Sequence, residues 1–257
     1  MSLAAIDPAI LGPAFVAGVL VTATHAPLGI QVLNRGIVFI DLAIAQVAGL
    51  GVILADSVGL EPQGWAVQAA ALVAAFAGAL LLTWTEKHWP EVQEAIIGTV
   101  FILAASGALL LLAANPHGGE HLKELLVGQI LWVNWPRLLP VALTYAVLLA
   151  LLFGVGERLG RMGFYLVFAV AVTVSVQLVG LYLVFTTLIV PALATHRLRH
   201  GRLAICYALG AAGYGAGLLV SALLDLPSGA VIVWGLALLA VPVFVLGTRR
   251  IRNGVTG

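Results

Sequence analysis

Long apolar stretches separated by short polar segments dominate the chain and predict its secondary structure. A helix needs about 20 predominantly apolar residues to cross a bilayer. Candidate stretches occupy residues 10–33, 37–54, 65–84, 95–114, 138–153, 164–179, 181–195, 203–224 and 229–248. Because the sixth and seventh meet at Val179-Gly180, they form either one broken helix or a tight hairpin. We therefore expect an all-α polytopic membrane protein with eight or nine transmembrane helices, organised as a single transmembrane domain over residues 1–257.

The composition supports a membrane protein and argues against several other classes. Hydrophobic residues make up 62% of the chain and charged residues 9%, with a mean hydropathy of +1.11. Soluble domains carry about 25% charged residues. The net charge of +1 argues against nucleic acid as a partner. The single cysteine, Cys206, excludes an internal disulfide and a cysteine-based zinc site. The sequence has no Gly-x-x-x-x-Gly-Lys-Ser/Thr loop, so any ATP hydrolysis must be performed by another chain.

Basic residues in the short loops predict the orientation in the membrane. Lysine and arginine are enriched in cytoplasmic loops, and arginines cluster in the segments 156–161, 196–202 and 249–252. These three segments are therefore expected to be cytoplasmic. The segment 55–64 carries two acids and no base, which is typical of the outer side. By the same alternation, the segment 115–137 falls outside.

Asp41 is an acid within an apolar stretch. An aspartate at the centre of a membrane helix costs roughly 2.5–3.5 kcal/mol on insertion scales, so such a group is usually retained to pair with something or to bind something. One interpretation is a salt bridge or helix cap near the interface, and the other is a side chain that lines or binds a transport path. Gln46 lies about 140° around the helix from Asp41, where it lines a neighbouring groove or bonds another helix.

His25 precedes Pro27, which removes an amide hydrogen and disturbs helical hydrogen bonding around residue 23. In one interpretation, Thr22, Thr24 and His25 satisfy the groups that the proline leaves free. In the other, His25 is a metal ligand across from Asp41, because a neutral imidazole and a carboxylate suit a borderline divalent ion. The sequence leaves both open.

Three polar residues of the outer segment, His117, Glu120 and His121, form the pattern His-x-x-Glu-His of inverted zincins. Pro116 and the glycines after it disfavour the helix that this motif needs, which argues against a membrane metallopeptidase. We expect an outer loop that leads into an amphipathic helix at 122–132 and whose polar end attracts cations or contacts a delivery protein. A solvated loop without a role is the alternative.

Two further features concern helix ends. Glu94 opens the predicted span 95–114, where the helix dipole favours an acid, and this predicts a capping role.

Pro191 is expected to break the predicted helix 181–195 near its cytoplasmic end. Broken helices within membrane bundles often line a path, because irregular backbone is tolerated only where protein or a cavity covers it. The polar residues in 164–195 are Thr173, Ser175, Gln177, Thr186 and Thr187.

Four short elements, in order along nearly the whole chain, resemble those of the membrane-spanning permease of metal ABC transporters, the ABC-3 type that carries zinc, manganese or iron. They are Pro27-Leu28-Gly29 with Arg35 and Phe39-Ile40-Asp41; Glu94-Ala-Ile-Ile-Gly98; Leu126-Val-Gly128-Gln-Ile130-Leu-Trp-Val133; and Val179-Gly180 followed by Leu188-Ile189-Val-Pro191-Ala192. Each element is weak alone, and their order and spacing make the resemblance fairly specific.

The resemblance implies a bundle like that of type II ABC importer permeases. It also implies a homodimeric pore, two cytoplasmic ATPase subunits and an extracytoplasmic metal-binding protein. It makes Asp41 an acid of the metal pathway. Relatives carry a histidine one turn later, where this chain has Ala45 followed by Gln46, and His25 could compensate.

A second departure from the family concerns the loop 154–163, which is shorter than in relatives. We expect it to contact the ATPase through Glu157, Arg158 and Arg161.

Together these features predict the permease subunit of an ATP-driven divalent-metal importer, with zinc favoured over manganese or iron. We expect a multi-pass protein of the bacterial inner membrane, surrounded by lipid. It is not itself an enzyme: it carries no covalently bound cofactor, takes the metal as substrate and leaves ATP to a partner subunit. The alternatives are an ABC permease for a non-metal or metal-chelate substrate, and, in a different class, a stand-alone secondary transporter or an intramembrane enzyme.

Overall fold

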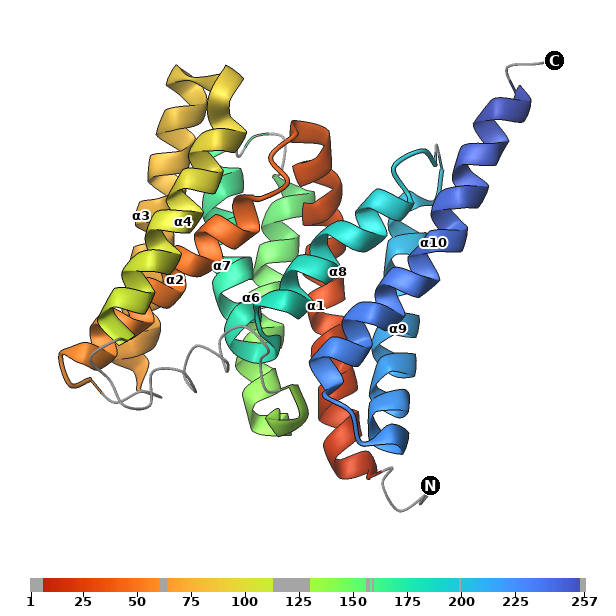
Figure 1. The fold of residues 1–257 in the computed structure, drawn as a ribbon, viewed down its shortest axis with the longest axis horizontal. Coiled ribbons are helices and arrows are strands. Elements are labelled where there is room, and N and C mark those ends of the chain that lie inside the picture. Colours follow the sequence, from red (N-terminus) through yellow and green to blue (C-terminus); the bar gives the residue numbers. More distant parts are fainter. Residues whose placement is uncertain are drawn as a thin grey trace. The chain divides into compact units, whose positions relative to one another are not determined.

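The computed structural model describes residues 7–60, 64–112, 130–155, 158, 160–198 and 200–254. Within these ranges the chain forms nine α-helices and two short 3₁₀ helices, with no strand (Figure 1). The helices are α1 (Pro8–Arg35), α2 (Ile40–Ser57), α3 (Trp65–His88), η2 (Pro90–Val92), α4 (Gln93–Leu112), η3 (Ile130–Trp132), α6 (Trp135–Gly154), α7 (Gly160–Val179), α8 (Leu181–Ala194), α9 (Arg202–Leu224) and α10 (Ser228–Gly254).

The all-α prediction is confirmed, and every predicted span corresponds to one helix. Seven helices in the described ranges are long and apolar enough to cross a membrane: α1, α2, α3, α6, α7, α9 and α10. α4 is an apolar helix of 20 residues, whereas α8, with 14 residues, is shorter than a full crossing. Large apolar side chains such as Val73, Leu139 and Trp234 are more than half exposed, as expected of helix faces that contact lipid.

The chain divides into two compact units, which are described separately. The first unit comprises residues 1–35, 127–145 and 178–257, and the second comprises residues 36–126 and 146–177. The first therefore contains α1, α8, α9 and α10, and the second contains α2, α3, α4 and nearly all of α7. The prediction of one transmembrane domain over residues 1–257 stays a prediction.

In the first unit, α1 and α9 pack in antiparallel directions through small residues. The ring of Tyr214 on α9 lies against Gly18 of α1, and Thr22 of α1 lies against Gly210 of α9. Near the end of α1, Arg202 Nη1 donates a hydrogen bond of 3.4 Å to Asn34 Oδ1. Because lipid offers no hydrophobic force between helices, close approach at glycines is what makes this packing favourable.

The helix α8 packs against α1 at Gly29, where the Leu188 carbonyl leaves no room for a Cβ atom. The prediction that Pro191 breaks this helix is wrong, since α8 continues through Pro191 to Ala194. The interruption lies at Gly180 instead, whose φ of 86° belongs to the region that glycine alone adopts readily. The segment 164–195 therefore forms two helices that are separated by one glycine.

In the second unit, α2 packs against both α3 and α4. Its antiparallel contact with α3 brings Gly51 against Ala74 and Val47 against Gly78. Its contact with α4 is parallel, since Val38 meets Glu94 near the starts of the two helices and Leu50 meets Gly107 further along. The start of α2, which carries Asp41, is therefore next to the start of α4.

Candidate functional site

Asp41 lies in the first turn of α2 and is completely buried, with 0% of its surface exposed. Ala45 and Ala48 follow at intervals of four and three residues and are also buried, so they share the helix face of Asp41. Among the described residues, neither carboxylate oxygen of Asp41 has a hydrogen-bond partner. The N-cap residue, Phe39, makes no side-chain capping hydrogen bond. Both interpretations of Asp41, as a structural residue and as an ion-binding one, therefore stay predictions.

His25 lies within α1 and is also completely buried. Its Nδ1 is 3.0 Å from the carbonyl oxygen of Val21 and 3.0 Å from Thr24 Oγ1. A nitrogen that faces a carbonyl carries the hydrogen, so the lone pair lies on Nε2, which is buried without a partner in the described part of the chain. Metal-binding histidines usually donate their second ring nitrogen in this way. This tautomer leaves Nε2 able to bind a metal ion.

The carbonyl that Pro27 leaves free has a partner that the sequence did not predict. Pro27 lacks the amide hydrogen that would bond the Ala23 carbonyl, and Tyr207 of α9 donates its hydroxyl to that oxygen at 3.3 Å. Thr22 and Thr24 instead donate to the carbonyls of Gly18 and Val21. The Ala23 carbonyl is therefore bonded by Tyr207 and not by Thr22 or Thr24, and His25 is not needed for it.

The candidate residues are divided between the units. His25 belongs to the first unit and Asp41 and Gln46 belong to the second, so the placement of His25 across from Asp41 stays a prediction. Gln46 is partly exposed on α2. In the ranges that the structure covers, no three His, Cys, Asp or Glu side chains gather as a metal site. His117, Glu120, His121 and Glu157 lie outside the described residues.

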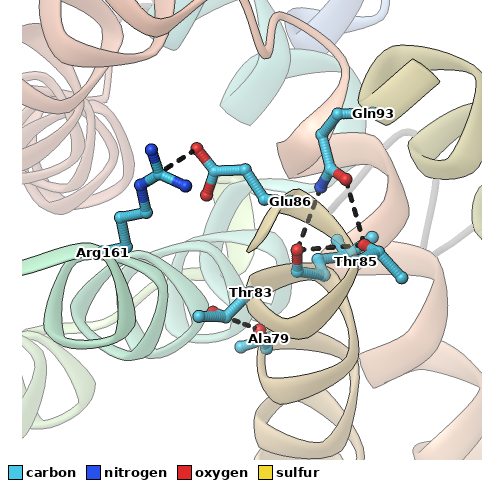
Figure 2. Close-up of polar contacts among 7 residues, drawn as sticks. Ala79, Thr83, Thr85, Glu86, Gln93 and Arg161 are labelled. Atoms are coloured by element: carbon cyan, nitrogen blue, oxygen red, sulfur yellow. Dashed lines mark hydrogen bonds and ion pairs between the residues drawn. The ribbon is translucent and has the colours of Figure 1, made fainter. Parts of the chain in front are cut away.

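The two remaining residues of the predicted ATPase contact, Arg158 and Arg161, are exposed. Arg161 lies in the first turn of α7, and its Nε lies 3.9 Å from Oε1 of Glu86 on α3, an ion pair that Figure 2 shows. The Arg161 side chain is 59% exposed. Its charge therefore remains accessible to a partner.

Glu94 has a contact that the sequence did not reveal. It lies in the first turn of α4, as predicted. However, its Oε1 accepts a hydrogen bond of 2.6 Å from the backbone amide of Val38, which precedes α2. The sequence showed only that Glu94 lies near the start of its own helix, α4, and this position did not reveal the bond to the segment before α2.

The sequence profile of the ABC 3 transport family matches residues 8–159 and 154–247, which together cover most of the chain. The chain belongs to the ABC 3 transport family. Family membership makes it the membrane subunit of a transport system of the metal ABC transporter type, a multi-pass protein that is not itself a catalytic enzyme.

Two solved structures share the fold of this ABC 3 family member. PsaBC from Streptococcus pneumoniae, in complex with a Fab, matches with a TM-score of 0.75 and 20% identity, over 95% of each chain. A proposed metal-chelate type ABC transporter in an inward-facing conformation matches with a TM-score of 0.67 and 17% identity, over 97% of this chain and 91% of that chain. The predicted permease-like bundle is therefore confirmed.

Proposed function

We propose that the chain is the permease subunit of an ATP-driven importer of divalent metal ions, with zinc favoured over manganese and iron. It would act as a homodimer in the bacterial inner membrane, with two cytoplasmic ATPase subunits and an extracytoplasmic metal-binding protein. Membership of the ABC 3 transport family supports a partner ATPase. The absence of a phosphate-binding loop in the sequence is consistent with this division of work.

The observation that carries the proposal is the Asp41 carboxylate, buried with neither oxygen bonded in the described residues. A buried charge without a partner is costly, and a bound cation would supply the missing partner. The bare Nε2 of His25 offers a second donor of the kind that zinc accepts. A carboxylate together with an imidazole also suits manganese and iron. The donor types therefore support a divalent metal ion as substrate but do not distinguish zinc from manganese or iron.

A metal chelate is the second candidate substrate, and two observations favour it. The position where relatives carry a histidine is Ala45, and the described residues contain no cluster of three metal-binding side chains. A chelate brings its own ligands and needs fewer from the protein. One of the two similar folds is described as a metal-chelate type transporter.

Uptake by the reconstituted complex tests the proposal. The permease, its ATPase and its binding protein in proteoliposomes should take up zinc faster than manganese or iron when ATP is supplied. Asp41→Asn should lower uptake at least tenfold. Asp56→Asn, which neutralises an acid near the other end of α2, is the matched control and should stay within about twofold of wild type. Wild-type uptake by the Asp41→Asn complex would refute the assignment. Uptake of a chelate but not of free ion would favour the second candidate.

The loop 154–163 is assigned to the ATPase contact through Glu157, Arg158 and Arg161. Charge reversal by Arg158→Glu should reduce ATP-driven uptake while leaving metal binding unchanged. Arg137→Glu changes another exposed arginine, at the start of α6 on the side expected to face outwards, and should have little effect. Equal uptake by both variants would place the ATPase contact elsewhere. His117, Glu120 and His121 remain candidates for contact with the metal or its binding protein.

A further inference from the structure

Two acids lie near the start of α2, and only one of them bonds the backbone there. The first amides of a helix have no intrahelical partner and need an acceptor from elsewhere. Phe39, the N-cap residue, carries no acceptor on its side chain. Asp41 lies in the first turn, where aspartate commonly bonds such amides, yet its oxygens make no hydrogen bond in the described structure. Glu94 of α4 instead supplies an acceptor to the backbone amide of Val38, in the turn that leads into α2.

The bond between Glu94 and α2 is short and charge-assisted. Glu94 Oε1 accepts from the Val38 amide at 2.6 Å, within the range of strong hydrogen bonds to a carboxylate. Both residues belong to the second unit, in which α2 and α4 run parallel and in contact. The other carboxylate oxygen of Glu94 is buried and has no partner in the described residues. The side chain is therefore held at the start of α2 by this bond.

The start of α4 is itself fixed, by the neighbour of Glu94. Gln93 is buried, its Nε2 donates to the Leu82 carbonyl of α3 at 3.0 Å, and its Oε1 accepts from Thr85 Oγ1 at 3.0 Å, as Figure 2 shows. These bonds tie the start of α4 to the end of α3. Glu94 therefore reaches the start of α2 from a position that its surroundings determine.

From this geometry we infer that Glu94 is a positioning residue: it caps the start of α2 from the neighbouring helix and so leaves the Asp41 carboxylate free for the transported ion. Glu94 does not touch the ion in this account. When Glu94 is removed, the Val38 amide at the entry to α2 loses its acceptor, and the nearby Asp41 carboxylate becomes the available replacement. The inference rests on the proposed function of Asp41 as the ion-binding acid.

Hydrogen exchange tests the cap without reference to transport. In the wild-type complex, peptides that resolve residues 36–39 should show a protected Val38 amide and a faster amide at the exposed Gly36. Glu94→Ala should speed exchange at Val38 at least tenfold. Glu94→Gln keeps an oxygen acceptor and should remain within about threefold. Glu91→Ala removes an exposed acid of η2 and is the matched control. Val38 exchange as fast as that of Gly36 in wild type would overturn the cap, even if the Glu94→Ala complex failed to fold.

Metal uptake tests the consequence for Asp41. Glu94→Ala should raise the half-saturating metal concentration about tenfold, with a maximal rate within about twofold of wild type, whereas Glu94→Gln and Glu91→Ala should leave both values near wild type. Faster exchange at Val38 with an unchanged half-saturating concentration would overturn the positioning role. The proposed function fails separately, if Asp41→Asn itself transports normally.

Discussion

His25 in α1 and Asp41 in α2 are both completely buried in apolar helices, one in each unit, but their surroundings differ. His25 is bonded through Nδ1 to the Val21 carbonyl of its own helix, which fixes its ring, while its Nε2 has no partner among the described residues. Neither oxygen of Asp41 has a hydrogen-bond partner in the described residues, and the Val38 amide just before its helix donates to Glu94.

This difference separates two ways of keeping a polar group in a membrane protein. A hydrogen bond to the backbone of the same helix lowers the cost of burying His25, so this residue can be purely structural. The same bond places the lone pair on Nε2, where a metal ion could bind. Asp41 has no such local compensation, and the positive end of the α2 dipole relieves its charge only in part. Asp41 is therefore the stronger indication of a bound ion, and His25 is the weaker one.

The largest loss of stability is expected from a substitution that displaces α1, the helix that holds His25. Gly29→Ala would place a methyl group on the Leu188 carbonyl of α8, where backbone must move to admit it. We expect a loss of about 3 kcal/mol or more in the free energy of unfolding, at the upper end for overpacked sites. Denaturant titration in mild detergent would measure this loss.

Gly98→Ala in α4 is the matched control, because nothing lies within 4 Å of the added methyl group. It should leave stability unchanged or raise it by up to about 1 kcal/mol, since alanine is the better helix former. Similar losses of stability in both variants would show that α1 and α8 are not tightly packed at Gly29.

Replacing each buried polar residue by leucine sharpens the comparison directly. Asp41→Leu should raise the stability of the metal-free protein by about 1–3 kcal/mol, because it removes a buried charge that no neighbour compensates. His25→Leu should change stability by less than about 1 kcal/mol, since the lost bond at Nδ1 and the removed bare Nε2 have opposing effects. Denaturant titration with and without a metal chelator measures both. Destabilisation by Asp41→Leu would mean that Asp41 has a structural partner.

The contact between Tyr207 and Ala23 can be tested by a double-mutant cycle. Tyr207→Phe should cost about 1 kcal/mol, because the Ala23 carbonyl loses its donor. In a Pro27→Ala background the same change should cost almost nothing, since residue 27 then supplies the helical amide hydrogen. Additive effects in the cycle would contradict the idea that Tyr207 compensates for Pro27.

The ion pair of Glu86 and Arg161 should have the smallest effect. At 3.9 Å and with the arginine largely exposed, Glu86→Gln should change stability by less than about 0.5 kcal/mol. The same titration, with Arg161→Gln alongside, measures the change. A larger loss that disappears in the double variant would show that this pair stabilises the second unit after all.

The spans were predictable because a bilayer leaves the backbone few alternatives to a helix. Their ends were less so: α3 continues to His88 and α10 to Gly254, beyond the apolar stretches that end at 84 and 248. Helical hydrogen bonding extends past the hydrocarbon region, so hydropathy marks the core of a span and not its limits.

The candidate site was predictable only where one residue carries the signal. Asp41 and His25 are conspicuous because they interrupt apolar sequence. The contact of Glu94 with Val38 joins α4 to the turn before α2, and the contact of Tyr207 with Ala23 joins α9 to α1. Such contacts depend on how helices pack, for which the sequence offers no periodic pattern.

The most direct test of the central claim is calorimetric titration of zinc into the purified permease–ATPase complex, comparing wild type with Asp41→Asn and Asp56→Asn. If the bare carboxylate of Asp41 meets the ion, Asp41→Asn should bind zinc at least about tenfold more weakly, a loss of about 1.4 kcal/mol, while Asp56→Asn binds like wild type. Equal affinity in all three complexes would contradict the account.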